Sequence, residues 1–141
     1  MKIAGKLKVY SDGASRGNPG PSAIAFIVLA EDKILKKWSK HVGVKTNNQA
    51  EYEALISALE FSSELAPQEV VCYLDSLLLV KQLNKDYQVK DFRLRALWLK
   101  TNELAKRFHK IAFVHVPRED AHIQEVDRLA NLTLDEVASR T

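Results

Sequence analysis

Val9-Tyr10-Ser11-Asp12-Gly13-Ala14-Ser15-Arg16-Gly17-Asn18-Pro19-Gly20 reads as an apolar strand that runs into one acidic residue. We expect a tight turn, rich in Gly and Asn, to follow Asp12 directly. A carboxylate at the end of a buried strand is costly unless a cation or hydrogen-bond donors pair with it. The turn offers backbone N–H groups, but its only cation, Arg16, is predicted to be exposed. Asp12 is therefore expected to meet a metal ion or a charged substrate, with partners from elsewhere in the chain.

The composition is that of a soluble globular protein, and 141 residues are enough for one domain with a substantial core. We expect residues 1–141 to form that single domain. A net charge of +3 and a pI of about 9.0 permit a polyanionic partner without requiring one. The single cysteine, Cys72, excludes an internal disulfide, and no stretch is apolar enough for a signal peptide or a membrane span. A cytoplasmic protein with no membrane partner is the expectation.

Hydrophobic periodicity predicts a mixed α/β fold. Three strands joined by short turns are expected at residues 6–11, 22–30 and 34–42, and they suggest an antiparallel meander. A helical stripe then begins after Thr46-Asn47-Asn48, with Asn or Thr as its N-cap, and ends at Pro67. The wholly apolar strand at residues 70–74 follows, and a strand–helix–strand crossover of this length implies parallel pairing.

The second half continues the alternation. We expect a short helix at residues 76–84, a longer one at residues 92–108 and a fifth strand at residues 111–116. Residues 118–124 are polar and predicted to form a loop before a C-terminal helix. The apolar stripe of that helix includes Val126, Leu129, Ala130, Leu134 and Val137. The fold class is therefore α/β, with a mixed five-stranded sheet (three antiparallel strands, then two parallel) flanked by helices.

Four acidic residues stand out by position. Asp12 and Asp75 each follow a predicted strand, Glu51 lies in the expected first turn of the first long helix, and Asp127 lies near the start of the last helix. Each has an ordinary explanation, since acids favour helix N-termini, Asp75 with Ser76 could cap a helix, and Asp12 could satisfy its own turn. Together they favour a site, because neighbouring parallel strands would bring Asp12 and Asp75 to the sheet edge where α/β proteins bind ligands.

Carboxylates that converge in this way repel one another unless a cation lies among them. Oxygen ligands suit Mg²⁺ or Mn²⁺, and the chain offers no Cys/His cluster for zinc. A pair of such ions is used for phosphodiester hydrolysis, in which one activates water and the other stabilises the leaving oxygen.

Four blocks of the sequence resemble the signature of the type 1 ribonuclease H family. They are Asp12–Gly20 (DGASRGNPG), Thr46–Glu51 (TNNQAE), Asp75-Ser76, and Asp127–Asn131 (DRLAN). Their order and the elements between them match as well, so the resemblance spans nearly the whole chain. It implies a ribonuclease H-like fold and an endoribonuclease that hydrolyses the RNA strand of RNA–DNA hybrids with two divalent metal ions.

By position, the resemblance makes four carboxylates the catalytic metal ligands. Asp12 and Asp75 would hold the central ion, Glu51 would face the scissile phosphate, and Asp127 would bind a second ion less tightly. The cofactor implied is Mg²⁺ or Mn²⁺, two ions per site.

The same resemblance suggests the groups that bind the hybrid. Asn amides and glycine-exposed backbone can contact the ribose 2′-OH in the minor groove, while hydroxyl and guanidinium groups can hold phosphates. The candidates are Asn18, Asn47, Asn48 and the backbone around Gly13 for the minor groove, Thr46 for a DNA-strand phosphate, and Arg16 for another phosphate contact. For Asn47 and Asn48 the alternative is that they only cap the helix.

Two departures from the family pattern matter. No compact basic protrusion lies between the Asp75-Ser76 helix and the last strand, which indicates the short subgroup, with weaker hybrid affinity and a modest salt dependence. The family's Asn shortly before its last Asp is absent. His122 is the best placed residue to assist catalysis and Arg118 the second, and the alternative for His122 is a surface or capping role.

The function predicted from the sequence is a monomeric, metal-dependent ribonuclease H. One alternative is a catalytically silent hybrid-binding module, which would not need four intact carboxylates. The other is a different metal-dependent nuclease or strand-transfer enzyme on the same fold, and the TNN and GNPG blocks favour the hybrid nuclease over it. Cleavage of double-stranded RNA stays open at this point.

Overall fold

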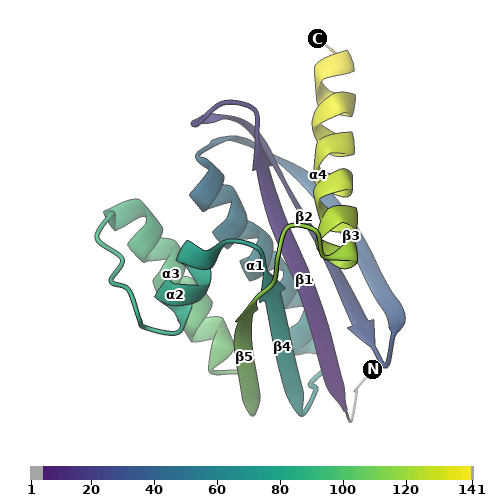
Figure 1. Ribbon diagram of the computed structural model, residues 1–141, viewed down its shortest axis with the longest axis vertical. Coiled ribbons are helices and arrows are strands. Elements are labelled where there is room, and N and C mark those ends of the chain that lie inside the picture. Colours follow the sequence, from purple (N-terminus) through teal and green to yellow (C-terminus); the bar gives the residue numbers. More distant parts are fainter. Residues whose placement is uncertain (1–4, 141) are drawn as a thin grey trace.

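Five strands form one mixed sheet in the order β3-β2-β1-β4-β5 (Figure 1). The computed structural model describes residues 5–140. Strands β1, β2 and β3 pair antiparallel, whereas β4 pairs parallel with both β1 and β5. The strands are β1 (Lys6–Ser15), β2 (Gly20–Ala30), β3 (Lys33–Lys45), β4 (Glu69–Leu74) and β5 (Lys110–His115). The predicted fold class, including three antiparallel strands followed by two parallel ones, is confirmed.

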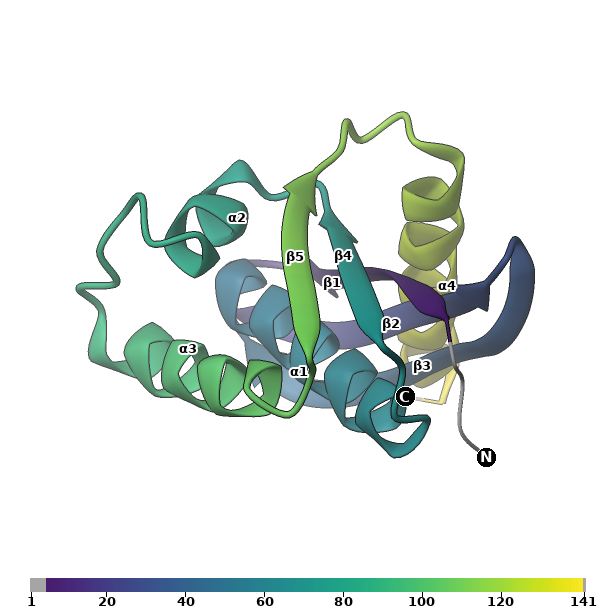
Figure 2. The same cartoon turned by 90° about the horizontal axis from the view of Figure 1, so that it is seen from below.

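Helices cover both faces of this sheet, with more helices on one face than on the other. Figure 2 shows α1, α2 and α3 together on one side and α4 on the other. The helices are α1 (Asn47–Glu64), α2 (Leu77–Leu83), α3 (Phe92–Ala105) and α4 (Ala121–Ser139). Among the described residues, no helix combines the length and the apolar character that a membrane crossing needs.

The central strands are apolar because both of their faces are buried. Leu7 and Val9 of β1 belong to the large core under α1, whereas Tyr10 belongs to the smaller core under α4. The free thiol of Cys72 is fully buried in the larger core. One polar residue connects the helices of that layer, since Gln82 accepts a hydrogen bond from Tyr52 Oη at 2.6 Å through Oε1 and one from Trp98 Nε1 at 3.0 Å through its carbonyl oxygen.

Strand β1 is longer than predicted, which changes the place of Asp12. The strand continues to Ser15, with Asp12 opposite Ala25 of β2, so the turn is at residues 16–19 and does not follow Asp12 directly. Gly13, Ala14 and Ser15 continue the antiparallel pairing with β2. Parallel pairing with β4 ends at Tyr10 and Tyr73. Asp12 therefore lies within a strand, just beyond the end of its parallel neighbour.

Helix α4 begins earlier than predicted. Residues 118–124 were expected to form a loop, but the helix starts at Ala121. The carboxylate Oδ1 of Asp120 accepts hydrogen bonds from the backbone N–H groups of His122 at 2.9 Å and Ile123 at 3.1 Å. Asp120 is thus an N-cap that satisfies two otherwise unpaired donors, and it places His122 in the first helical turn.

Glycine at position 13 lets β1 and α1 approach each other closely. A Cβ atom at Gly13 would lie 2.4 Å from the carbonyl carbon of Ala50 and 2.5 Å from the amide nitrogen of Glu51. These are backbone atoms, so they cannot move aside as a flexible side chain could. The contact fixes α1 against the strand directly beside Asp12 and Glu51.

The first prediction tests this contact. Gly13→Ala should lower the free energy of unfolding by roughly 1–3 kcal/mol or more, because the added methyl group forces α1 away from β1. Urea denaturation measures the change. Gly5→Ala is the matched control, since nothing lies within 4 Å of a Cβ built there. Equal stability of the two variants would contradict the close-approach explanation.

Candidate active site

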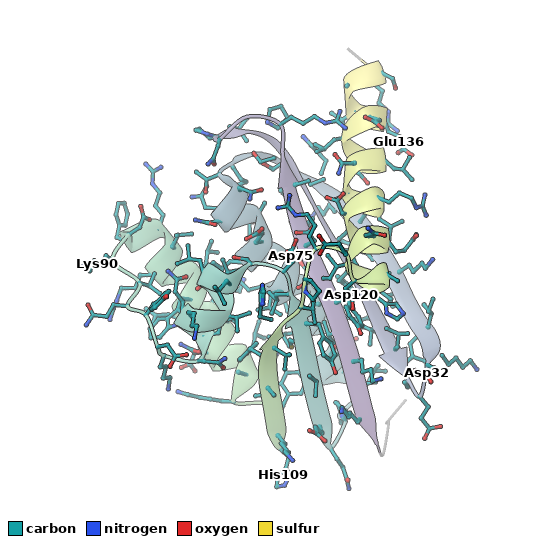
Figure 3. The ribbon with its side chains drawn as sticks, in the orientation of Figure 1. Asp32, Asp75, Lys90, His109, Asp120 and Glu136 are labelled. Atoms are coloured by element: carbon teal, nitrogen blue, oxygen red, sulfur yellow. The ribbon has the colours of Figure 1, made fainter. Side chains whose placement is uncertain are left out.

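Three carboxylates from three different elements meet at one place. Asp12 comes from β1, Glu51 from α1 and Asp75 from the residue after β4. One oxygen from each lies within 4.8 Å of the oxygens of the other two, which is an arrangement that could hold a metal ion. Figure 3 shows Asp75 at the sheet edge where β4 ends and Asp120 at the start of α4 nearby.

Asp127 approaches the same cavity from α4, the helix on the face of the sheet opposite to α1 (Figure 2). It is exposed on α4 and does not belong to the group of three, although it lines the cavity with them. The cavity has a volume of about 560 Å³. Its lining consists of Asp12, Gly13, Ala14, Ser15, Asn47, Glu51, Asp75, Arg118, Ile123, Gln124 and Asp127. The structure thus places all four predicted carboxylates on one cavity, three tightly grouped and one apart.

Burial and like charge make two of these acids reluctant to ionise. Burial raises the pKa of Asp12 well above its usual value, and the negative charges of Asp75, Glu51 and Asp127 raise it further. Its hydrogen bond from the Gly13 N–H, at 3.0 Å, only partly opposes this rise in pKa. Burial and Asp75 raise the pKa of Glu51 to about 7, against smaller lowering effects of a Ser76 hydrogen bond and Arg118.

The ordinary explanations for these acids do not account for their positions. Glu51 is the fifth residue of α1 and Asp127 the seventh of α4, so both lie past the first turn in which the helix dipole acts strongly. The N-cap of α2 is Ser76, whose Oγ accepts a hydrogen bond from the Leu79 N–H at 3.2 Å. Asp75 is therefore free of that capping role.

Little positive charge balances the cluster. Within residues 5–140, the ion pair made by these carboxylates joins Asp75 Oδ2 to Arg118 Nε at 3.7 Å, and the Arg118 side chain is 90% exposed. An exposed pair at this distance contributes little. A buried group of carboxylate oxygens without a cation fits a divalent ion that prefers oxygen ligands, such as Mg²⁺ or Mn²⁺.

The start of α1 carries the predicted substrate-binding amides. Thr46 is the N-cap, its Oγ1 accepting from the Gln49 N–H at 3.2 Å while Gln49 Oε1 accepts from the Thr46 N–H at 2.9 Å. Asn47 and Asn48 are consequently not the cap, which removes the alternative considered for them. Asn18 Oδ1 accepts a hydrogen bond from the Asn47 N–H at 3.0 Å and so connects the β1–β2 turn to the helix.

A second hollow of about 250 Å³ lies beside these amides. Its lining combines the start of α1 with the start of α3: Asn18, Thr46, Asn48, Gln49, Asp91, Arg93 and Leu94. The sequence interpretation did not place Asp91 and Arg93 near the site. Asp91 caps α3 through hydrogen bonds to the N–H groups of Arg93 and Leu94, and this capping signal is visible in the sequence, but the proximity of the two helix starts is not.

Two other predicted residues make contacts away from the cavity lining. Arg16 Nη2 lies 2.5 Å from Asp135 Oδ1 and 3.2 Å from the Asn131 carbonyl oxygen, so it connects the β1–β2 turn to α4. His122 is half-buried and its ring stacks on Tyr10, and it is not among the cavity-lining residues. Of the two residues expected to assist catalysis, the structure places Arg118 on the cavity and His122 beside it.

Comparison with known proteins places this chain in a family. The model of the reverse transcriptase-like family matches residues 10–133. Ribonuclease HI of Halobacterium salinarum is 39% identical over 133 residues, which cover 94% of this chain and 66% of that protein. The chain also spans 36% of the length of the bifunctional protein Rv2228c of Mycobacterium tuberculosis.

Solved structures agree with the sequence comparison. The N-terminal RNase H domain of Rv2228c superposes with a TM-score of 0.90 at 34% identity, covering 97% of this chain and 99% of that one. LC11-RNase H1, solved in complex with an RNA/DNA hybrid, gives a TM-score of 0.86 at 36% identity, covering 94% and 99%. The chain belongs to the ribonuclease H family.

The second prediction concerns pH without metal. The pKa of Glu51 is about 7 in the folded protein, against an ordinary value of 4.5, so the folded protein keeps a proton that the unfolded chain releases. Stability relative to Glu51→Gln should therefore fall as pH rises from about 4.5 to about 7, by about 1–3 kcal/mol. Urea denaturation in EDTA across this range measures the difference. Glu60→Gln, an exposed site on the same helix, should follow the wild type. Parallel curves for wild type and Glu51→Gln would contradict the prediction.

Proposed function

We propose that this chain is a ribonuclease H that hydrolyses the RNA strand of RNA–DNA hybrids with divalent metal ions. The observation that carries the proposal is the group of Asp12, Glu51 and Asp75, whose oxygens lie within 4.8 Å of one another and are not neutralised by a nearby buried cation. Support comes from relatives named ribonuclease HI and from the hybrid-bound structure of LC11-RNase H1.

The carboxylates divide the binding of metal among themselves. Asp12 and Asp75 would hold the central ion, Glu51 would hold the side of the site that faces the scissile phosphate, and the exposed Asp127 would contribute to a looser second site. Two bound Mg²⁺ or Mn²⁺ ions would supply the activation of water and the stabilisation of the leaving oxygen. Bound cations would also relieve the repulsion that, together with the larger effect of burial, raises the pKa of Asp12.

The amides beside the cavity would recognise the RNA strand. Asn47 is exposed at the cavity, and the Oδ1 atom of Asn18 is engaged with the Asn47 N–H, which leaves the Asn18 amide nitrogen as a donor. Together with Asn48 and the backbone at Gly13, these groups offer donors and acceptors to the 2′-OH groups that distinguish RNA from DNA.

The second hollow would hold a phosphate of the DNA strand. The Thr46 hydroxyl accepts a bond from Gln49 and keeps its own hydrogen to donate, and Arg93 brings a cation to the same hollow. Arg16 would have to exchange its ion pair with Asp135 for a phosphate contact. Every group named here comes from one chain, so the proposal takes the protein as a monomer.

The third prediction is that the protein cleaves RNA–DNA hybrids and that this activity requires Asp12. Labelled RNA–DNA, RNA–RNA and DNA–DNA duplexes are incubated with the protein in Mg²⁺ and in Mn²⁺, and products are resolved on a gel. We expect cleavage of the RNA strand of the hybrid, and its loss by about a thousandfold or more in Asp12→Asn, because the central ion loses a charged ligand. Asp32→Asn is the matched control, since Asp32 lies in the exposed β2–β3 turn, apart from Asp75 (Figure 3).

Each result of that assay has a distinct meaning. Hybrid binding without cleavage by the wild type would indicate the silent binding module, and cleavage of DNA–DNA would indicate a different metal-dependent nuclease. Cleavage of RNA–RNA beside the hybrid would extend the substrate class to double-stranded RNA. Retained hybrid cleavage in Asp12→Asn would refute the role given to that carboxylate.

The fourth prediction is that metal stabilises the folded state. Mg²⁺ or Mn²⁺ at millimolar concentration should raise the melting temperature, because a site assembled from three separate elements exists only in the folded chain. Differential scanning calorimetry with and without EDTA measures the shift. Asp12→Asn should lose most of the shift, while Asp32→Asn should retain it. An equal shift in all three proteins would mean that the ions bind elsewhere.

A further inference from the structure

Three aromatic rings stack under the start of α4. Tyr10 of β1 and Tyr73 of β4 are register partners on adjacent strands, and their ring centroids are 4.8 Å apart with an interplanar angle of 17°. The His122 ring from the first turn of α4 lies on Tyr10, with centroids 4.5 Å apart and an interplanar angle of 30°. The stack therefore joins two strands of the sheet to α4, which covers this face.

Both ends of this stack lie close along the chain to a carboxylate of the site. Tyr10 precedes Asp12 by two residues, which puts both side chains on the same face of β1, roughly 7 Å apart along the strand. His122 precedes Asp127 by five residues, or about 7–8 Å along the helix axis. The contact between His122 and Tyr10 therefore lies close to Asp127 along α4 and close to Asp12 along β1.

Asp127 depends on such a support because little else orients it. It is exposed, it makes no ion pair within the described residues, and the contact of its carboxylate is with Asn131 Nδ2 of its own helix at 3.3 Å. Its place over the cavity is thus set by how α4 packs on the sheet. Apolar residues hold the middle of the helix: Val126, Ala130 and Leu134. At the N-terminal end, Ile123, the Asp120 cap and the His122 ring do so.

We propose that His122 is a positioning residue, whose ring on Tyr10 sets the first turns of α4 and thereby places Asp127 across the cavity from Asp12. This inference rests on the proposed function, because the position of Asp127 matters for activity only if Asp127 helps to bind metal. It assigns His122 no proton transfer, in agreement with its absence from the cavity lining and with one ring face being covered by Tyr10.

The test compares His122→Ala, which removes the ring, with His122→Phe, which keeps a ring able to stack but cannot carry a proton. Hybrid cleavage is titrated with Mg²⁺ and with Mn²⁺, kcat and KM are determined separately at saturating metal, and the pH profile is recorded. Hydrogen exchange of the backbone amides of residues 122–127 reports how well ordered the first turns of α4 are, independently of activity.

For His122→Ala we expect the metal concentration at half-maximal activity to rise by roughly two- to tenfold, the shift that loss of one aromatic contact produces. Exchange at residues 122–127 should accelerate by a similar factor, whereas KM for the hybrid should change little. His122→Phe should restore both the metal requirement and the protection from exchange, and the shape of the pH profile should be the same in all three proteins. Leu104→Val is the control, because it removes a buried methylene from α3, which carries none of the four carboxylates, and should lower stability without raising the metal requirement.

Two results would overturn the proposal. If His122→Phe is as defective as His122→Ala and its pH profile changes, the imidazole acts chemically; if His122→Ala changes neither metal requirement nor exchange, the stack positions nothing. His122→Leu, apolar but without a ring, replaces His122→Ala should that variant fail to fold. Should the wild type cleave no hybrid, the proposed function fails, and the exchange rates together with the Mn²⁺-induced shift in melting temperature of each variant still decide the role of the stack.

Discussion

The contact between Gly13 and the backbone at Ala50 is the constraint on which the site depends. It brings β1 and α1 closer than any side chain would allow, and the residues next to it on the two elements are Asp12 and Glu51. Because β4 ends at Leu74 beside the same stretch of β1, Asp75 arrives as the third member. The absence of a Cβ atom at Gly13 thus determines how close the carboxylates of β1 and α1 lie to each other.

The fold keeps these acids together at a cost in stability. Desolvation and mutual repulsion oppose ionisation of Asp12 and Glu51, and the exposed Arg118 compensates them only weakly. The cores on the two faces of the sheet hold the elements in place regardless of this repulsion. Such an arrangement is typical of sites whose strain is relieved by a bound cation. The fourth carboxylate differs, since Asp127 reaches the cavity from α4 on the opposite layer and depends on the packing of that helix.

Much of the fold could be predicted because hydrophobic periodicity reports directly on burial. The apolar strand β4, the helical stripe of α1 and an Asn or Thr cap before it were all recognisable from local pattern, and the structure assigns the cap to Thr46. Two boundaries were not. An acid followed by Gly13 suggested a turn, although the pairing of β1 with β2 continues to Ser15, and the polar run before Ala121 suggested a loop, although Asp120 caps a helix there. The first error arose because pairing with β2 decides where β1 ends. The second overlooked a local signal, since Asp120 accepts hydrogen bonds from the N–H groups of His122 and Ile123, only two and three residues later.

The order of residues alone was enough to indicate the α/β class and the order of the elements and to single out four acids, since each of these depends on neighbours in the chain. It could not show that three of the acids form a tight group while Asp127 stands apart, or that Arg16 pairs with Asp135. Nor could it show that His122 stacks on Tyr10, from a part of the chain more than a hundred residues earlier. Such contacts are decided by how helices and strands pack against one another, and only the folded structure contains those distances.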